Sequence, residues 1–208
     1  MTDLSRGRFI AIEGIDGSGT TSQTRALAAW LGSRGHSVVQ TREPSRGAIG
    51  TLIRQRLSVA AAPLEPAALA LLFAADRLDH IASEVEPGLA AGAVVLSDRY
   101  FLSSLAYQAL DCDAAWVGQI NARAPRPDLT LLLALPVEVA FARVQRRMAQ
   151  EGAVEERFDA LELQRRIARH YQQFSADPAI GPVCVVDGDQ PPEAVTGALI
   201  RALIAIGL

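Results

Sequence analysis

A glycine-rich stretch near the N-terminus, EGIDGSGTTSQ over residues 13–23, constrains the fold more than any other part of the sequence. It follows a short apolar run at residues 9–12 and precedes a segment whose apolar residues recur at helical spacing. Strand, glycine loop and helix in this order place a ring of backbone N–H groups at a helix N-terminus, where phosphate binds. Gly14 and Gly19 have the spacing of a Walker A motif. We therefore expect a phosphate-binding loop, although a glycine-rich turn without a ligand is the alternative for this stretch taken alone.

The loop departs from the Walker A pattern at one position. Thr20 stands where the motif has lysine, and all 20 Lys and Arg residues of the chain are arginine. A cation near the phosphates must therefore be an arginine, a metal or a group from a partner chain. A unit charge about 4 Å from a phosphate is worth roughly 4 kcal/mol at an effective dielectric of 20, so the loss of lysine has to be offset or tolerated. Thr21 stands where the Mg²⁺-binding hydroxyl belongs.

Composition and charge narrow the class of protein. The chain has 208 residues, of which 50% are hydrophobic and 21% charged, and this fits one globular domain over residues 1–208. A net charge of −3 argues against a general nucleic-acid binder. Cys112 and Cys184 lack metal-ligand spacing, so we expect reduced packing residues in a cytoplasmic protein. Residues 1–8 are too polar for a signal peptide, and the apolar run at 129–136 is far shorter than the ~20 residues of a membrane span.

Apolar periodicity and Gly/Pro breaks predict alternating strands and helices. The predicted strands cover residues 8–12, 36–41, 93–97, 129–135 and 183–186. The predicted helices cover residues 22–35, 50–59, 66–86, 102–110, 114–121, a segment from 136, 161–174 and 192–206. The polar stretch 150–156 contains a glycine and indicates a flexible loop. The alternation predicts an α/β fold with a doubly wound parallel sheet, whose strands end along one edge where ligands bind.

The third predicted strand closes on an acid and an arginine, Asp98 and Arg99, in the run AVVLSDR. An apolar strand ending in an acid is the Walker B arrangement. Asp98 could hold Mg²⁺ through water or orient a phosphate-binding arginine, and Arg99 could bridge phosphoryl oxygens. A surface Asp–Arg pair at the end of a strand is the alternative.

Phe73 and Arg77 lie one helical turn apart and therefore share a helix face. An aromatic plane beside a guanidinium group suits a nucleobase, because stacking on an aromatic side chain is worth ~1–3 kcal/mol per base. A core phenylalanine next to a solvated arginine is the alternative. Asp79 and His80 follow closely, and we expect both on the surface.

Taken in order, EGIDGSG, TREP, LLFAADR, DRY followed by LSSLAYQ, and PDLTLLL resemble the thymidylate kinases, a family of P-loop nucleoside monophosphate kinases. The resemblance extends from residue 9 to about residue 190. It implies the P-loop NTPase fold, a three-layer α/β/α structure with a five-stranded parallel sheet flanked by helices. It also implies transfer of the γ-phosphoryl group of ATP to dTMP with Mg²⁺ as cofactor, in a homodimer.

The resemblance further implies roles on the ATP side. The phosphate loop would comprise Gly14, Ile15, Asp16, Gly17, Ser18, Gly19, Thr20, Thr21 and Ser22. Thr21 and Asp98 would serve Mg²⁺. Arg147 and Arg157 would belong to a lid, about residues 146–158, that closes on ATP, and Gln190 would lie by the adenine. The implied catalytic residues are Asp16, Arg42, Asp98, Arg99, Arg147 and Arg157.

On the dTMP side, the resemblance implies contacts with each part of the nucleotide. Asp16 would reach the sugar 3′-OH and the acceptor phosphate, and Arg42 and Arg99 would bind phosphate. The other implied contacts are Phe73 stacked on thymine, Arg77 on a ring carbonyl, Ser104 near the base, Tyr107 by the sugar where it could exclude a 2′-OH, and Gln108 close to Tyr107.

The missing lysine suggests the hypothesis that a relocated guanidinium group does its work. The candidates are Arg146, Arg147 and Arg157, with Arg46 in the loop after TREP as a fourth. A solvated basic helix end is the alternative for these arginines.

Two other functions of the chain remain open. One is a nucleotide-binding homologue that lost catalysis with its lysine. The other is a kinase of another pyrimidine monophosphate, because the thymine methyl group is worth only ~1–3 kcal/mol.

Overall fold

The computed structural model describes residues 6–58, 60–151, 158 and 160–208. A five-stranded parallel sheet forms its centre, with strand order β2-β3-β1-β4-β5. The strands are β1 (Arg8–Gly14), β2 (Val38–Arg42), β3 (Val94–Asp98), β4 (Leu129–Ala134) and β5 (Val183–Asp187). The predicted α/β class and all five strands are confirmed. Because β1 lies in the middle, the glycine loop that follows it emerges at the centre of the sheet edge.

The pairing register of the strands places the glycine loop, the DR motif of β3 and the TREP motif at the end of β2 next to one another at one edge of the sheet. Ile12 of β1 pairs with Asp98 of β3, and Asp98 in turn pairs with Arg42 of β2. On the other side of β1, Gly14 pairs with Leu133 of β4. The glycine loop, the acid of β3 and the arginine of TREP therefore meet at the carboxyl edge, where parallel sheets bind their ligands.

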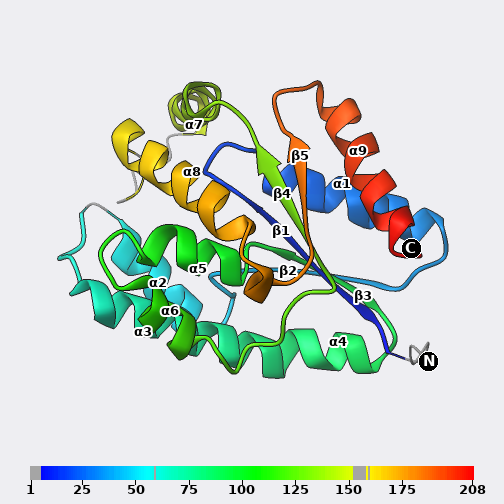
Figure 1. The fold of residues 1–208 in the computed structure, drawn as a ribbon, viewed down its shortest axis with the longest axis horizontal. Helices are drawn as coiled ribbons and strands as arrows, with labels where there is room; N and C mark the ends of the chain where they lie inside the picture. The colour runs from blue at the N-terminus through cyan, green and yellow to red at the C-terminus, as the bar shows by residue number, and fades with distance from the viewer. Residues whose placement is uncertain (1–5, 59, 152–157, 159) are drawn as a thin grey trace.

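Helices cover both faces of the sheet and form three layers (Figure 1). The face under α1 (Thr20–Ser33) and α9 (Pro192–Ala205) buries Ile10 and Ile12 of β1 with apolar residues of both helices. The opposite face buries Phe9 and Ala11 under helices that include α5 (Phe101–Gln108) and α8 (Leu161–Ser175). Successive residues of β1 thus point to opposite cores, as the two-residue period of a strand requires.

The long helix predicted at 66–86 is divided and extends further. It comprises α3 (Pro66–His80), a π-helical segment (Ile81–Val85) and α4 (Glu86–Ala90). The helix was predicted to end at residue 86, before Gly88, but Gly88 lies within α4. A Cβ atom there would be 2.9 Å from Val95 Cγ2, so this glycine allows the helix to pack closely on the sheet. The turn comes later, at Gly92 with φ 76°.

The remaining helices follow the prediction closely. They are α2 (Ala48–Leu57), α6 (Ala114–Ile120) and α7 (Val137–Glu151), and a 3₁₀ turn (Pro178–Ile180) precedes β5. Residues 150 and 151, predicted in the flexible loop, belong to α7, and the rest of that predicted loop lies outside the described residues. Cys112 and Cys184 are free, as expected. No helix in the described part of the chain is long and apolar enough to cross a membrane.

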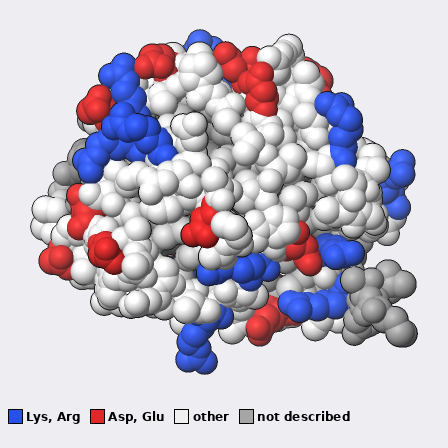
Figure 2. Space-filling view, viewed as in Figure 1, with Lys and Arg blue, Asp and Glu red and all other residues white. Residues whose placement is uncertain are grey.

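Charged side chains are mixed on the surface. On the face shown in Figure 2, acidic groups lie beside or between the basic ones, and uncharged atoms cover most of the area. That face therefore presents no extended field of one sign, which a nucleic-acid backbone would require.

Candidate functional site

The glycine loop between β1 and α1 has a backbone that side chains would obstruct. Gly17 and Gly19 have φ of 83° and 95°, in the left-handed region that favours glycine. A Cβ atom at Gly17 would lie 2.2 Å from the Ala140 carbonyl oxygen, so only glycine lets α7 approach the loop. Gly19 caps α1 without a side-chain hydrogen bond. The first N–H groups of α1 therefore point toward the loop as donors for an anion.

A cavity of about 360 Å³, which we call the loop cavity, lies over this backbone. The glycine loop contributes Ile15, Asp16, Gly17, Gly19, Thr20, Thr21 and Ser22, and other elements contribute Arg42, Asp98, Arg99, Arg143, Val144, Arg147 and Met148. Gly14 and Ser18, also predicted as loop residues, are buried and are not among the residues that line this cavity. The Ser18 hydroxyl has no hydrogen-bond partner among the described residues. Four arginines thus line the cavity in which Thr20 carries no charge.

The two residues predicted to bind metal are in contact. Thr21 Oγ1 donates a hydrogen bond of 2.5 Å to Asp98 Oδ2, and both residues line the loop cavity. Hydroxyl and carboxylate oxygens are the ligands that Mg²⁺ takes, together with water and substrate phosphates. Among the described residues, no group of three His, Cys, Asp or Glu side chains could hold a metal without such help. The donor set therefore suits a magnesium ion that arrives with a nucleotide.

A second cavity of about 140 Å³, the inner cavity, adjoins the first. All eight residues that were predicted to bind dTMP line it: Asp16, Arg42, Phe73, Arg77, Arg99, Ser104, Tyr107 and Gln108. Its wall also contains Glu43, Pro44, Arg54, Leu57, Tyr100, Ser103 and Phe158. Asp16, Arg42 and Arg99 line both cavities and so form a shared wall between them.

Arg77 is buried, contrary to the alternative of a solvated arginine. Its Nε and Nη2 donate to Glu43 Oε2 at 3.0 and 2.6 Å, and Nη2 also donates to the Tyr100 carbonyl oxygen at 3.0 Å. Its Nη1 donates to Ser104 Oγ at 3.0 Å and to Asn121 Oδ1. These five bonds use all five N–H donors of a guanidinium group. The Arg77 side chain is therefore held rigidly at the wall of the inner cavity.

His80 was expected on the surface, and this prediction is wrong. The side chain is fully buried, with Nδ1 3.1 Å from Glu43 Oε1 and Nε2 2.6 Å from Thr41 Oγ1. The polar partners on β2 and in the loop after it make burial of the imidazole possible. Asp79 is exposed, as expected. His80 and Arg77 thus hold the two oxygens of one carboxylate, that of Glu43.

Arg99 is one of the three residues of the shared wall. Its φ of 73° is unusual for a residue other than glycine, and a strained backbone of this kind is typical of functional sites. Nη2 donates to Asp16 Oδ1 at 2.6 Å, and Nη1 donates to the Gly14 carbonyl oxygen at 3.0 Å. Burial disfavours the charged form, but nearby Tyr107 and Asp16 outweigh it, and the pKa of Arg99 is raised well above its ordinary value. Tyr107 Oη also donates to Asp16, at Oδ2 and 2.9 Å.

Glu13 holds the start of α5 beneath this wall. Its fully buried carboxylate accepts hydrogen bonds from the backbone N–H groups of Tyr100 and Ser103 at 2.8 and 3.1 Å. It also accepts from the hydroxyls of Ser103 and Tyr171 at 2.5 and 3.0 Å. Burial raises the pKa of the Glu13 carboxyl, and the hydrogen bonds from Ser103 oppose this only in part. Glu13 was not predicted as a site residue, although it opens the EGIDGSG motif.

The raised pKa of Glu13 predicts a pH dependence of stability. Above its ordinary value of about 4.5, the folded chain retains the Glu13 proton longer than the unfolded chain does. The contribution of Glu13 to the free energy of unfolding therefore falls as the pH rises through this window. Because Glu13→Gln cannot titrate, we expect the wild-type stability minus that of the variant to decrease from about pH 4.5 upward. Urea unfolding of both proteins across this range measures the difference, and a constant or rising difference would contradict the prediction.

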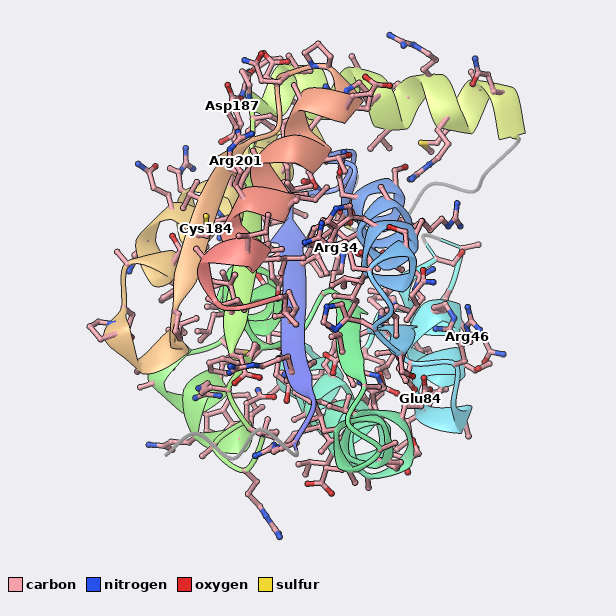
Figure 3. The ribbon with its side chains drawn as sticks, turned by 90° about the vertical axis from the view of Figure 1, so that its right-hand side faces the viewer. Arg34, Arg46, Glu84, Cys184, Asp187 and Arg201 are labelled. Atoms are coloured by element: carbon pink, nitrogen blue, oxygen red, sulfur yellow. The ribbon has the colours of Figure 1, made fainter. Side chains whose placement is uncertain are left out.

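The arginines predicted to replace the Walker A lysine differ in where they lie. Arg147 lines the loop cavity, whereas the structure does not place Arg146 or Arg46 among the described residues that line either cavity. Figure 3 labels Arg46 beside α2, away from α7. Arg157 lies outside the described residues. Arg143, one turn before Arg147, also lines the loop cavity and was missed as a candidate, although the spacing of four residues places both on one helix face.

The structure leaves the role of Gln190 a prediction. Its exposed side chain donates to Asp187 Oδ2 at 2.8 Å, at the end of β5. Arg143 of α7 lies 3.4 Å from the Gly188 carbonyl oxygen, so α7 and this loop adjoin.

Arg54 lines the inner cavity and was also missed as a candidate site residue. It donates to the carbonyl oxygens of Pro44 and Ser45 at 2.9 and 2.7 Å and holds the loop after TREP at the inner cavity.

Two adjoining cavities with a shared wall are what phosphoryl transfer requires, because donor and acceptor phosphates must meet. The fold and site therefore define a P-loop nucleotide kinase. A family model described as thymidylate kinase matches residues 12–198. The chain thus belongs to the thymidylate kinase family.

Individual relatives agree with this family model. A "Probable thymidylate kinase" of Pyrococcus horikoshii is 44% identical over 175 residues, which cover 82% of this chain and 83% of the relative. A "Thymidylate kinase" of Cereibacter sphaeroides is 39% identical over 208 residues, covering 96% and 95%. Another, of Carboxydothermus hydrogenoformans, is 37% identical over 195 residues, covering 91% and 93%. These matches cover 82–96% of this chain and 83–95% of the relatives.

Proposed function

We propose that this chain transfers the γ-phosphoryl group of ATP to dTMP, giving dTDP for dTTP synthesis. The observation that carries the proposal is the shared wall of Asp16, Arg42 and Arg99 between the loop cavity and the inner cavity. Membership of the thymidylate kinase family supports it independently. Residues 1–208 would act as one domain, with a lid at about residues 146–158.

The loop cavity would hold the phosphates of ATP. Backbone N–H groups of the glycine loop and of the first turn of α1 would bind the phosphate oxygens. Thr21 and Asp98 would hold Mg²⁺, which neutralises charge on the transferring group when bound. Arg143 and Arg147 of α7 line the same cavity and would supply cationic contacts in place of lysine. Their guanidinium groups remain charged at any physiological pH.

The inner cavity would hold dTMP with its phosphate toward the shared wall. Arg42 and Arg99 would bind that phosphate, Asp16 would receive the sugar, and Phe73 would stack on the base. Arg77 has all its N–H groups engaged, so it would meet a ring carbonyl by sharing the N–H now given to Ser104. Gln108 Oε1 is buried and lacks a partner among the described residues, which suits an acceptor for the N–H of the base.

The proposal includes a homodimer. Leu71 and Leu78 on α3 are 50% and 39% exposed and lie on one helix face, and Leu52 on the neighbouring α2 is 37% exposed. Exposed leucines on adjacent helices are suited to burial against a second copy of the chain. The resemblance to homodimeric kinases points to the same association.

One assay tests the function directly. ADP formation from ATP and Mg²⁺ is measured by coupled assay with dTMP, dUMP, UMP and CMP in parallel. We expect dTMP to be the best acceptor, with dUMP about ten- to a hundredfold lower in kcat/KM, since the two differ by one methyl group. Activity with none of them would favour a homologue that lost catalysis. Preference for UMP or CMP would establish a different pyrimidine kinase.

A further inference from the structure

A glutamine of α8 reaches the centre of the site. Gln164 is buried, and its Nε2 donates two hydrogen bonds, one of 2.9 Å to Asp16 Oδ2 and one of 2.8 Å to the Phe158 carbonyl oxygen. Asp16 belongs to the glycine loop and lines both cavities, and Phe158 lines the inner cavity. One amide group therefore connects the phosphate loop to the segment that precedes α8.

The chemistry of its neighbours fixes the orientation of this amide. A carboxylate and a backbone carbonyl are both acceptors, so the NH₂ end must face them. Gln164 Oε1 then points elsewhere and, among the described residues, is buried without a donor. An unsatisfied buried acceptor lowers stability. Because the amide oxygen is unpaired, the two donated hydrogen bonds are the contacts that account for a glutamine at this position.

The contacts of Gln164 form a closed ring. Tyr107 Oη donates to the same oxygen of Asp16, Oδ2, at 2.9 Å. The rings of Tyr107 and Phe158 pack edge to face, with centroids 5.2 Å apart at 86°. Each residue of this ring therefore restricts the movement of the next, in the order Asp16, Gln164, Phe158, Tyr107 and back to Asp16. Moving the Gln164 amide would release the carboxylate on one side and the Phe158 backbone on the other.

We propose that Gln164 is a positioning residue that fixes the Asp16 carboxylate and holds Phe158 against the inner cavity. It acts through these two residues and does not itself line the cavity among the described residues. The proposal rests on the proposed function, because it assigns the ring to dTMP binding. Asp16 lines both cavities, but Tyr107 and Phe158 line only the inner cavity, so the larger effect should fall on dTMP.

The test compares Gln164→Met with Gln173→Met. Methionine keeps the length and approximate volume of glutamine but donates no hydrogen bond. Gln173 is an exposed residue of the same helix and serves as the matched control. We expect Gln164→Met to lower kcat/KM for dTMP about ten- to a hundredfold, as for loss of a hydrogen bond to a charged group. The KM for ATP should change less than about twofold, and Gln173→Met should match wild type.

A double mutant and a crystal structure distinguish a positioning role of Gln164 from a general disruption of the fold by the substitution. If Gln164 acts through Asp16, then Gln164→Met should cost much less in an Asp16→Asn background. An unchanged kcat/KM for dTMP, or an equal rise in both KM values, overturns the proposal. So does a crystal structure of Gln164→Met in which Asp16 and Phe158 keep their wild-type positions. If wild type phosphorylated no dTMP, the proposed function would fail, and the crystal structures would still decide whether Gln164 positions these residues.

Discussion

Replacing Arg147 with alanine should lower the turnover number about a hundredfold or more, which is the range of arginines that stabilise phosphoryl transfer. Arg147 lines the loop cavity, and the described residues offer its side chain no hydrogen bond or ion pair. Its charge is therefore available to a phosphate. Because Thr20 replaces the lysine, no lysine ammonium group in the glycine loop can compensate for the loss of the Arg147 charge. A charge about 4 Å from phosphate is worth roughly 4 kcal/mol gross at an effective dielectric of 20.

Arg146→Ala is the matched control for this prediction. Arg146 is the adjacent residue of α7, is exposed and carries the same charge, but it lies apart from the described residues of the cavity wall. Its replacement should change turnover less than about twofold, as expected of a solvated surface charge. Thr20→Lys in the Arg147→Ala background should restore part of the activity. Steady-state kinetics with ATP varied at saturating dTMP measures all three, and equal losses for Arg146 and Arg147 would refute the assignment.

Arg42→Ala should raise the KM for dTMP about ten- to a hundredfold and lower kcat as well, because charge-assisted bonds to phosphate are strong. Arg42 ends β2, level with Asp98, and lines both cavities. Its exposed side chain has no ion pair among the described residues, so it can bind the acceptor phosphate directly. Because that phosphate accepts the transferred group, poor placement should also slow the chemical step.

Arg46→Ala serves as the control for Arg42. Both arginines are exposed. Arg42 ends β2 and Arg46 lies in the connection from β2 to α2, away from the described walls of the two cavities. Its loss should leave both KM values within about twofold of wild type. Calorimetric titration with dTMP provides a binding measurement independent of turnover. Unchanged dTMP affinity in Arg42→Ala would remove this residue from the acceptor site.

The architecture could be predicted because its causes are local. Apolar runs of strand length, broken by Gly and Pro, located all five strands, and the glycine spacing located the loop after β1. The helix predicted to end at residue 86 continues through Gly88, and this difference shows the limit of such reasoning. Glycine weakens a helix by intrinsic propensity, but close packing on Val95 and Val39 required its small size inside α4. Sequence alone does not reveal which helix approaches a sheet that closely.

Site residues that directly follow a strand could be predicted from the sequence. Site residues that reach the site through contacts between distant helices and loops could not. Asp98, Arg99 and Arg42 follow strands, so their meeting at one edge follows from a parallel sheet. His80 and Gln164 belong to helices, and nothing in their local sequence shows that one meets Glu43 and the other Asp16. Their roles depend on which helix face turns inward. That choice is made by packing across the whole domain.

Thr20 leaves the side chains of the phosphate cavity without a primary amine. Reagents that acylate or form Schiff bases with lysine, and acetylating enzymes that modify it, find no target there, whereas dicarbonyl reagents specific for guanidinium do. An ammonium group begins to lose its proton near pH 10, but guanidinium does not. We therefore expect binding of a nucleotide's phosphates at this site to persist at alkaline pH values at which a Walker A lysine would lose its proton.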